Sequence, residues 1–159
     1  MTVDATKEIG LAVVGCGTVG RIRAMFARQY PGVGWIGLCD IDEDLGRKLA
    51  GDCKADFFTT SYTELLERPE VNASIIATDE NNHAGPCIAS AEKGHAMFIE
   101  KPLATDALES EQIANALRTG KIDAVVGYTQ RFRRRFLAIK ERLLTGQIGN
   151  VTSVVTRAF

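Results

Sequence analysis

The sequence lacks the features that mark several large classes of protein. No stretch reaches the roughly 18 consecutive apolar residues that a membrane-spanning helix needs. The chain also has no low-complexity tract and no internal repeat. Its formal net charge is only −1, so no excess of one sign would draw it to a nucleic acid or to an anionic membrane. The sequence therefore gives no reason to expect either partner.

Cysteine and histidine are scarce, and they are not spaced for cross-links or for metal binding. The cysteines are Cys16, Cys39, Cys53 and Cys87. They form no C-x-x-C pair and show no metal-ligand spacing with His83 or His95. Most of them fall in or beside apolar runs, where a reduced cysteine behaves as a small hydrophobic residue. We therefore expect no metal site and a reducing, cytoplasmic compartment. Asp4 and Glu8, which precede the first apolar run, argue against a cleavable signal peptide.

The residues that are present have the composition of an ordinary globular protein. The chain has 159 residues, of which 45% are hydrophobic and 25% are charged, and this length suffices for one domain with a sizeable core. Five short runs are almost continuously apolar, as parallel strands buried on both faces are. The strands expected from these runs are residues 9–14, 33–39, 73–77, 96–99 and 122–126.

Helical patterns lie between the expected strands. The longer helices are expected over residues 18–30, 85–93 and 106–118. Ser61 and Glu64 form the Ser-x-x-Glu pattern of a capping box, which opens a short helix before Pro69. Gly120 is a plausible C-cap for the last helix. This alternation of strands and helices predicts an α/β fold, a doubly wound and mostly parallel sheet with helices on both faces.

A G-x-G-x-x-G pattern joins the first expected strand to the first helix. It consists of Gly15, Cys16, Gly17, Thr18, Val19 and Gly20. Gly15 permits the tight turn, Gly17 lets a pyrophosphate approach the backbone, and Gly20 lets the helix pack close to the strand. The helix N-terminus offers N–H groups and a positive dipole end to the phosphates. The pattern predicts that this loop binds a dinucleotide, although similar turns also occur without ligands.

An acidic residue follows the second expected strand, twenty residues beyond Gly20. In a dinucleotide-binding fold this position holds the carboxylate that binds the adenosine ribose hydroxyls. We therefore expect Asp40, with Ile41 beside it, to contact the cofactor. A carboxylate here repels a 2′-phosphate, which favours NAD over NADP, and Arg47 lies too far along the next helix to bind that phosphate. The alternative is that Asp40 only caps this helix, as Asp42 could.

Polar side chains follow each of the three later strands. They lie in residues 78–83, 100–102 and 127–132. In open α/β sheets, ligands bind beyond the carboxyl ends of the strands. Three successive strands that deliver polar side chains to one rim are hard to explain by surface solvation alone.

With these motifs the chain resembles the Gfo/Idh/MocA oxidoreductases, which include glucose–fructose oxidoreductase and inositol dehydrogenase, over essentially its whole length. The resemblance rests on the glycine loop with Asp40, Thr78…His83, Ala91-x-x-Gly94-His95…Glu100-Lys101-Pro102, Gly127…Arg131-Phe132 and Gly146-x-Ile148-Gly149. It implies a six-stranded nucleotide-binding domain, here residues 1–127, followed by a substrate domain. It also implies an NAD-dependent dehydrogenase that acts on a polyol, a sugar or a similar compound, and a full-length protein that forms a homo-oligomer.

The resemblance implies roles for individual residues. The lysine of the E-K-P motif, here Lys101, would bond the reacting oxygen beside the nicotinamide, and Glu100 would orient it or touch the nicotinamide ribose. Cofactor contacts are expected from the loop residues Thr78, Asn82 and His83. The alternatives are a surface ion pair between Lys101 and Glu100, and a structural role for His83.

Four other positions bear on the comparison with this family. Arg131 matches the arginine of the family's N-x-R-F turn and is expected to help shape the substrate pocket. The family usually has Pro-Asn where this chain has Asp79 and Glu80, which puts the family role of that loop in doubt. Arg23 stands where many relatives have histidine, and the sequence assigns it no function.

The last part of the chain departs from the alternation of strands and helices. Residues 128–149 are expected to form a connecting helix and a turn. The apolar stripe of this helix is Phe132, Phe136, Ile139 and Leu143, and its other faces are basic. Such a helix can bind a membrane or a nucleic acid, but a solvated face on a packed helix is more common. Residues 150–159 are expected to be the first strand of a truncated second α+β domain.

The resemblance also indicates what this stretch lacks. The family's general acid/base is generally a histidine in the substrate domain, whereas His83 and His95 both belong to the first domain. We therefore expect this chain to bind cofactor but to lack full catalysis. Two other classes stay open. A dinucleotide-binding sensor or regulatory module would have no use for Lys101, and an interaction domain would have an empty site.

Overall fold

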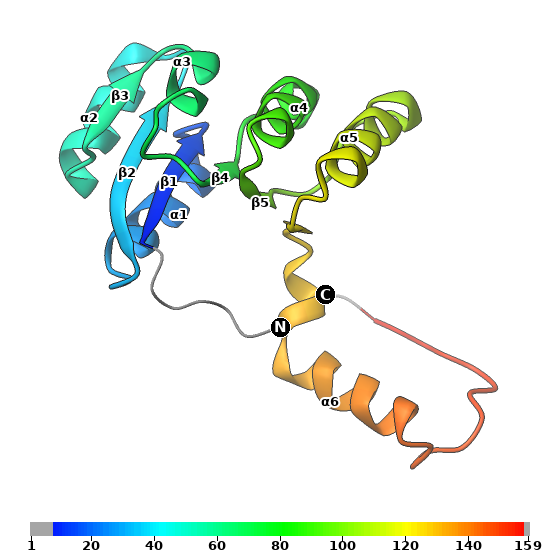
Figure 1. Ribbon diagram of the computed structural model, residues 1–159. Coiled ribbons are helices and arrows are strands. Elements are labelled where there is room, and N and C mark those ends of the chain that lie inside the picture. The colour runs from blue at the N-terminus through cyan, green and yellow to red at the C-terminus, as the bar shows by residue number, and fades with distance from the viewer. Residues whose placement is uncertain (1–7, 158–159) are drawn as a thin grey trace. The chain divides into compact units, whose positions relative to one another are not determined.

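The computed structural model describes residues 8–157. Contacts within the chain divide it into two compact units, residues 1–127 and residues 128–159. The first unit consists of a β-sheet with its helices, and the second begins with a 3₁₀ helix followed by an α-helix (Figure 1).

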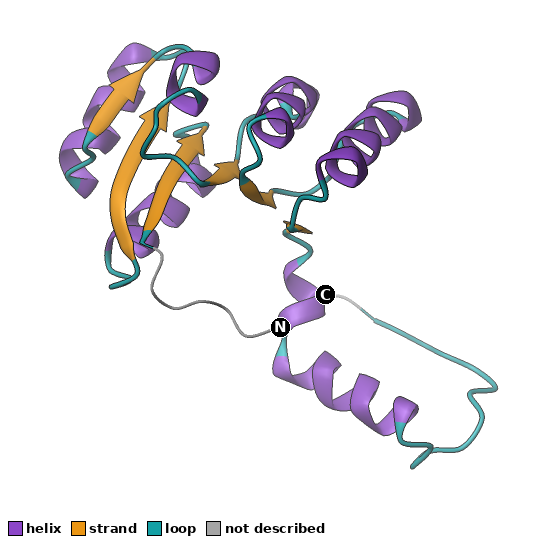
Figure 2. Cartoon of the chain, in the orientation of Figure 1, coloured by secondary structure: helices purple, strands orange, loops and turns teal. Residues whose placement is uncertain are grey.

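Within the described residues, one parallel sheet holds six strands in the order β3-β2-β1-β4-β5-β6 (Figure 2). The strands are β1 (Ile9–Val14), β2 (Val33–Cys39), β3 (Phe57–Thr59), β4 (Ala73–Ile76), β5 (Ala96–Ile99) and β6 (Ala124–Val126). The strand order reverses between β1 and β4, which is the switch point of a doubly wound sheet. Val14 lies beside Cys39 and Ile76. Ile99 in turn lies beside Ile76 and Val126, so the carboxyl ends of the strands are level at one edge.

Helices cover both faces of this sheet, because successive strand residues point to opposite faces and both sets are apolar. The helices of the first unit are α1 (Thr18–Arg28), α2 (Glu43–Cys53), α3 (Tyr62–Leu66), η1 (Glu80–Asn82, a 3₁₀ helix), α4 (Ala84–Glu92) and α5 (Ala107–Gly120). On β1, Leu11 and Val13 pack in a core with α1 and α2. Ala12 and Val14 pack in a second core with α3, α4 and α5. The predicted six-stranded Rossmann fold is confirmed.

Several element bounds differ from the sequence expectation. The strand β3 was not expected, because three residues are too few to show a period. The strands β4 and β6 are shorter than expected, and α1 ends at Arg28. Gly120 is the last residue of α5 and not its cap. Lys121 takes the left-handed conformation instead, with φ +52°.

The capping box forms only in part. Ser61 is the N-cap of α3, and its hydroxyl accepts a hydrogen bond from the Glu64 N–H at 3.4 Å. The Glu64 carboxylate does not return to the Ser61 N–H. It accepts a hydrogen bond from the Thr59 hydroxyl, which ties α3 to the end of β3.

The second unit contains η2 (Thr129–Phe132, a 3₁₀ helix) and α6 (Arg134–Leu144). The expected apolar stripe is split, because Phe132 belongs to η2 and the extended residue Arg133 separates it from α6. The strand expected over residues 150–159 is not formed by residues 151–157. A strand requires a neighbour to satisfy its backbone N–H and C=O groups. No helix within residues 8–157 is long and apolar enough to cross a membrane.

A buried histidine lies at the start of β5, at the opposite end of this strand from Glu100. His95 is 5% exposed, and its Nδ1 atom has no hydrogen-bond partner among the described residues. Burial, reinforced by the charge of Lys93, lowers the pKa of His95. The folded protein therefore holds this imidazole in its neutral form at neutral pH.

This burial predicts a loss of stability in mild acid. Unfolding returns His95 to an ordinary pKa of about 6.5. The unfolded state therefore binds more protons as the pH falls from there toward the lower pKa of the folded state, and the free energy of unfolding decreases over that range. Urea titrations at about pH 7.5 and about pH 5 measure this change. The free energy of unfolding should decrease more for the wild type than for His95→Gln, whose side chain cannot titrate in this range. Equal decreases would show that His95 is not responsible.

Candidate functional site

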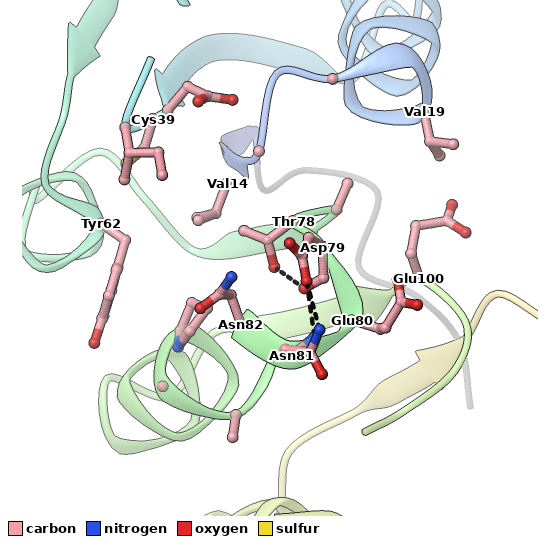
Figure 3. A pocket seen from close by; sticks show the side chains of 18 of the residues that line it. Val14, Val19, Cys39, Tyr62, Thr78, Asp79, Glu80, Asn81, Asn82 and Glu100 are labelled. Atoms are coloured by element: carbon pink, nitrogen blue, oxygen red, sulfur yellow. Dashed lines mark hydrogen bonds between the residues drawn. The ribbon is translucent and has the colours of Figure 1, made fainter. Parts of the chain in front are cut away.

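A cleft of about 740 Å³ lies in the first unit, beyond the carboxyl ends of the strands. The glycine loop, the ends of β2 and β4, and residues 100–101 line it. Figure 3 shows Val19 and Glu100 toward one end of the cleft and Cys39 and Tyr62 toward the other. This volume is in the usual range of small-molecule and cofactor sites.

The three glycines of the loop differ in their surroundings. Gly15 has φ +97°, and a Cβ atom added to it would lie 2.5 Å from the Ala77 backbone. A Cβ atom on Gly20 would lie 1.8 Å from the Gly15 carbonyl oxygen. At Gly17, by contrast, an added Cβ atom would have no neighbour within 4 Å among the described residues. Gly15 and Gly20 are thus required for the packing of strand and helix, whereas Gly17 leaves space that a ligand can occupy.

The helix N-terminus at this space has no side-chain cap. Gly17 is the N-cap residue of α1, and it has no side chain that could accept the first N–H groups of the helix. The first intrahelical bond runs from the Arg21 N–H to the Gly17 carbonyl at 2.8 Å. The N–H groups of the first turn are therefore available to an anion.

Asp40 is held by backbone donors from two segments. Its Oδ2 atom accepts a hydrogen bond from the Cys16 N–H at 2.6 Å, and its Oδ1 atom accepts one from the Asp42 N–H at 2.9 Å. The N-cap of α2 is Asp42, which accepts from the Leu45 N–H at 3.0 Å. The alternative that Asp40 caps this helix is therefore wrong. Ile41, 90% exposed, lines the same end of the cleft.

Burial keeps the thiols beneath the glycine loop neutral. Cys16 and Cys39 are both buried, and desolvation together with the Asp40 charge raises the pKa of each to about 12. The Cys16 thiol lies 3.6 Å from the Cys39 carbonyl oxygen. Cys16 therefore packs in the core under the loop, Cys39 borders the cleft, and neither supplies a thiolate.

The loop after β4 is stabilised by its own side chains. Asp79 is the N-cap of η1, and its Oδ1 atom accepts hydrogen bonds from the Asn81 N–H and side-chain amide at 3.1 and 3.2 Å (Figure 3). The Thr78 hydroxyl donates to the Asp79 carbonyl at 3.1 Å. Thr78 and Asn82, both expected to contact a cofactor, line the cleft, as does Glu80.

His83 joins two loops from beneath the cleft. It is 1% exposed. Its Nδ1 atom lies 2.9 Å from the Pro102 carbonyl oxygen, and its Nε2 atom lies 3.3 Å from the Thr78 carbonyl oxygen. The described side chains that line the cleft do not include His83. With both ring nitrogens against backbone carbonyls, this geometry favours the structural role that the sequence left open.

The E-K-P segment separates its two charged side chains. Lys101 is exposed and lines the cleft, and it forms no ion pair with an acidic residue of the described chain. The Glu100 carboxylate is buried and pairs with Arg23 at 2.6 Å. The expected alternative, an ion pair between Lys101 and Glu100, is therefore wrong. Arg131 lies in η2, in the second unit.

Several residues of this site were not predicted from the sequence. Arg23, on α1, pairs with the cleft residue Glu100, and Leu45 and Tyr62 line the cleft from α2 and α3. Leu45 and Tyr62 follow the N-caps Asp42 and Ser61 closely, but nothing in their own pattern distinguished them from core residues.

A family model described as an oxidoreductase family with an NAD-binding Rossmann fold, Gfo/Idh/MocA, matches residues 9–128. The chain belongs to this family. The match covers every cleft residue, from Val14 to Glu109, and confirms the resemblance seen in the motifs.

The relatives include several inositol dehydrogenases. The inositol 2-dehydrogenase of Gluconacetobacter diazotrophicus is 31% identical over 92% of this chain and 44% of that protein. The myo-inositol 2-dehydrogenase of Thermotoga maritima is 26% identical over 87% of this chain and 42% of that protein. This chain thus spans less than half the length of these relatives.

Solved structures share the fold. The scyllo-inositol dehydrogenase of Lactobacillus casei, with bound NAD(H) and scyllo-inositol, has a TM-score of 0.84 and 18% identity to this chain. The match covers 92% of this chain and 44% of that one. At this level of identity the likeness shows the fold alone.

The glycine geometry predicts a contrast between two alanine substitutions. Gly20→Ala should lower the free energy of unfolding by about 1–3 kcal/mol, because its methyl group would overlap the Gly15 carbonyl. Gly17→Ala should change that free energy by less than about 0.5 kcal/mol, because the added methyl group enters open space. Urea unfolding of both variants without ligand measures the difference. Equal losses would contradict the assigned roles.

Proposed function

We propose that this chain is the cofactor-binding portion of an NAD-dependent dehydrogenase. The enzyme transfers hydride between the nicotinamide and a polyol, a sugar or a related hydroxyl or carbonyl compound. The observation that carries the proposal is one continuous cleft with an uncapped helix N-terminus and a fixed carboxylate at one side and Lys101 at another. The names of the inositol dehydrogenase relatives support a polyol substrate.

The residues present fit a dinucleotide. The open space at Gly17 admits a pyrophosphate against the first turn of α1, where N–H groups and the helix dipole favour negative charge. Asp40 would accept hydrogen bonds from the adenosine ribose, and Ile41 would cover that end of the cleft. Thr78 and Asn82 would line the path toward Lys101. When bound, the nicotinamide supplies the hydride acceptor or donor.

The charge around Asp40 supports NAD over NADP. Backbone N–H groups bind both carboxylate oxygens of Asp40. The side chain therefore cannot rotate to move its negative charge away from a 2′-phosphate. Arg47 does not offset it, because its guanidinium pairs with Glu43 at 2.6 Å. The repulsion between two fixed anions therefore favours the cofactor that lacks the phosphate.

Lys101 would act on the substrate oxygen. Its ammonium lines the cleft without an acidic partner in the described residues, so it can donate a hydrogen bond to the hydroxyl or carbonyl oxygen at the reacting carbon. A cation at this position stabilises the negative charge that develops on that oxygen. Arg131, from the turn after β6, would contribute to the substrate pocket.

The chain by itself is proposed to bind NAD and to turn over little. Its two histidines are buried, and the ring nitrogens of His83 face backbone carbonyls. Neither is placed to take a proton from a substrate in the cleft, so the acid/base group would come from a substrate domain. The full-length enzyme is proposed to be a cytoplasmic homo-oligomer, and the four buried free thiols suit a reducing compartment.

Calorimetry with the two cofactors tests the preference. The wild-type chain should bind NAD at least about tenfold more tightly than NADP, a difference of about 1.4 kcal/mol. Asp40→Asn should narrow this ratio, because it removes the charge and keeps the shape. Gly17→Ala, whose fold should be intact, is the control that weakens binding of both cofactors. Tighter binding of NADP by the wild type would contradict the proposal.

Substitution of Lys101 distinguishes a dehydrogenase from a non-catalytic dinucleotide-binding sensor. In a full-length protein, Lys101→Ala should lower turnover about 10²- to 10³-fold, the usual loss when one group that stabilises oxygen charge is removed. NAD affinity, measured by calorimetry, should stay within about twofold, because the ribose and phosphate contacts are elsewhere. Lys101→Arg keeps the charge and should retain more activity. Unchanged turnover in Lys101→Ala would favour a non-catalytic dinucleotide-binding module.

A further inference from the structure

Arg23 connects the helix of the glycine loop to the segment after β5 that carries Lys101. It lies on α1, three residues beyond Gly20. Its Nε and Nη2 atoms both donate hydrogen bonds to Oε1 of Glu100, at 2.8 and 2.6 Å. The two residues are 77 positions apart in the sequence. Only the fold therefore brings this cation to this acid.

A second contact holds the guanidinium in place. Its central carbon lies 4.8 Å from the centre of the Phe98 ring. Phe98 and Glu100 are two residues apart at the end of β5, so they point to the same side of the sheet, which α1 covers. Arginine is suited to this position because its planar group can stack on a ring and bind a carboxylate at the same time.

Because the pair is partly buried, the Glu100 carboxylate needs a cation beside it. The side chains of Arg23 and Glu100 are 31% and 11% exposed. A carboxylate so far removed from water is costly unless a cation compensates it. Without Arg23, the nearest cation along the chain is Lys101, the next residue, which lines the same cleft.

We propose that Arg23 is a positioning residue for Lys101. By occupying the Glu100 carboxylate, Arg23 leaves the Lys101 ammonium available to the reacting oxygen of the substrate. In its absence Glu100 would draw Lys101 into an ion pair and away from that oxygen. This inference rests on the role proposed for Lys101.

The chain itself allows a test that needs no turnover. The rate at which an acetylating N-hydroxysuccinimide ester modifies the Lys101 amine can be followed by peptide mass mapping. Arg23→Met should slow this modification about threefold to fivefold, the range that a partly exposed ion pair supports. The double variant Arg23→Met/Glu100→Gln should restore the wild-type rate, because a neutral side chain no longer attracts Lys101. The exposed residues Lys48 and Lys121 are internal controls whose rates should not change.

The labelling rates show whether Arg23 positions Lys101 or only stabilises the fold. If Arg23 only stabilises the fold, both variants will lose stability and Lys101 will react at the wild-type rate in each, which would overturn the inference. A slow rate that the double variant does not restore would also overturn it. Circular dichroism verifies folding. If Arg23→Met does not fold, Arg23→Gln, which keeps one hydrogen-bond donor, should show the same slowing.

Kinetics of a full-length protein provide a second readout. Arg23→Met should lower kcat and leave the calorimetric Kd for NAD unchanged, and Glu100→Gln in that background should recover part of kcat. If Lys101→Ala proves harmless to turnover, the proposed function of Lys101 fails. The labelling result still decides whether Arg23 controls the charge partner of that lysine.

Discussion

The close approach of the glycine loop to the end of β4 is the constraint on which the cleft depends. Gly15 turns the chain with φ +97°, against the Ala77 backbone, and Gly20 lies against the Gly15 carbonyl. This packing brings the start of α1 to the switch point of the sheet. It also brings the Cys16 N–H to within 2.6 Å of Asp40. A side chain at Gly15 or Gly20 would separate these elements and open the site.

Two acidic side chains of the cleft are held in fixed places by different partners. Backbone donors hold Asp40 at one side, and Arg23 neutralises Glu100 at another. Lys101 is left without an acidic partner in the described residues. His83 fixes the spacing of the two loops between them, because its ring spans the Thr78 and Pro102 carbonyls. A ligand that is anionic in its middle and carries hydroxyl groups at its Asp40 end fits this distribution.

Local patterns were sufficient for much of the fold and for the outline of the site. Strands buried on both faces appear as apolar runs, so β1, β2 and β5 could be predicted to the residue. The glycine loop and the spacing to Asp40 follow from the demands of a tight turn and a ribose-binding carboxylate. The three residues of β3 carry no detectable period. Residues 151–157 have β-forming composition, but they form no strand, because composition does not supply a partner.

The sequence by itself thus determined which segments are strands and helices, and which motifs stand at the strand ends, because burial and turn chemistry are local properties. Only the tertiary structure decided which side chains meet. The pairing of Arg23 with Glu100 joins residues 77 apart, and Asp40 is held by the Cys16 N–H, a donor 24 residues away in the glycine loop. Glu100 and Lys101 are neighbours in sequence, yet burial gives the acid to α1 and leaves the base at the cleft. Sequence proximity does not set such pairings, because the fold decides which distant charges, such as Arg23, also reach a given carboxylate.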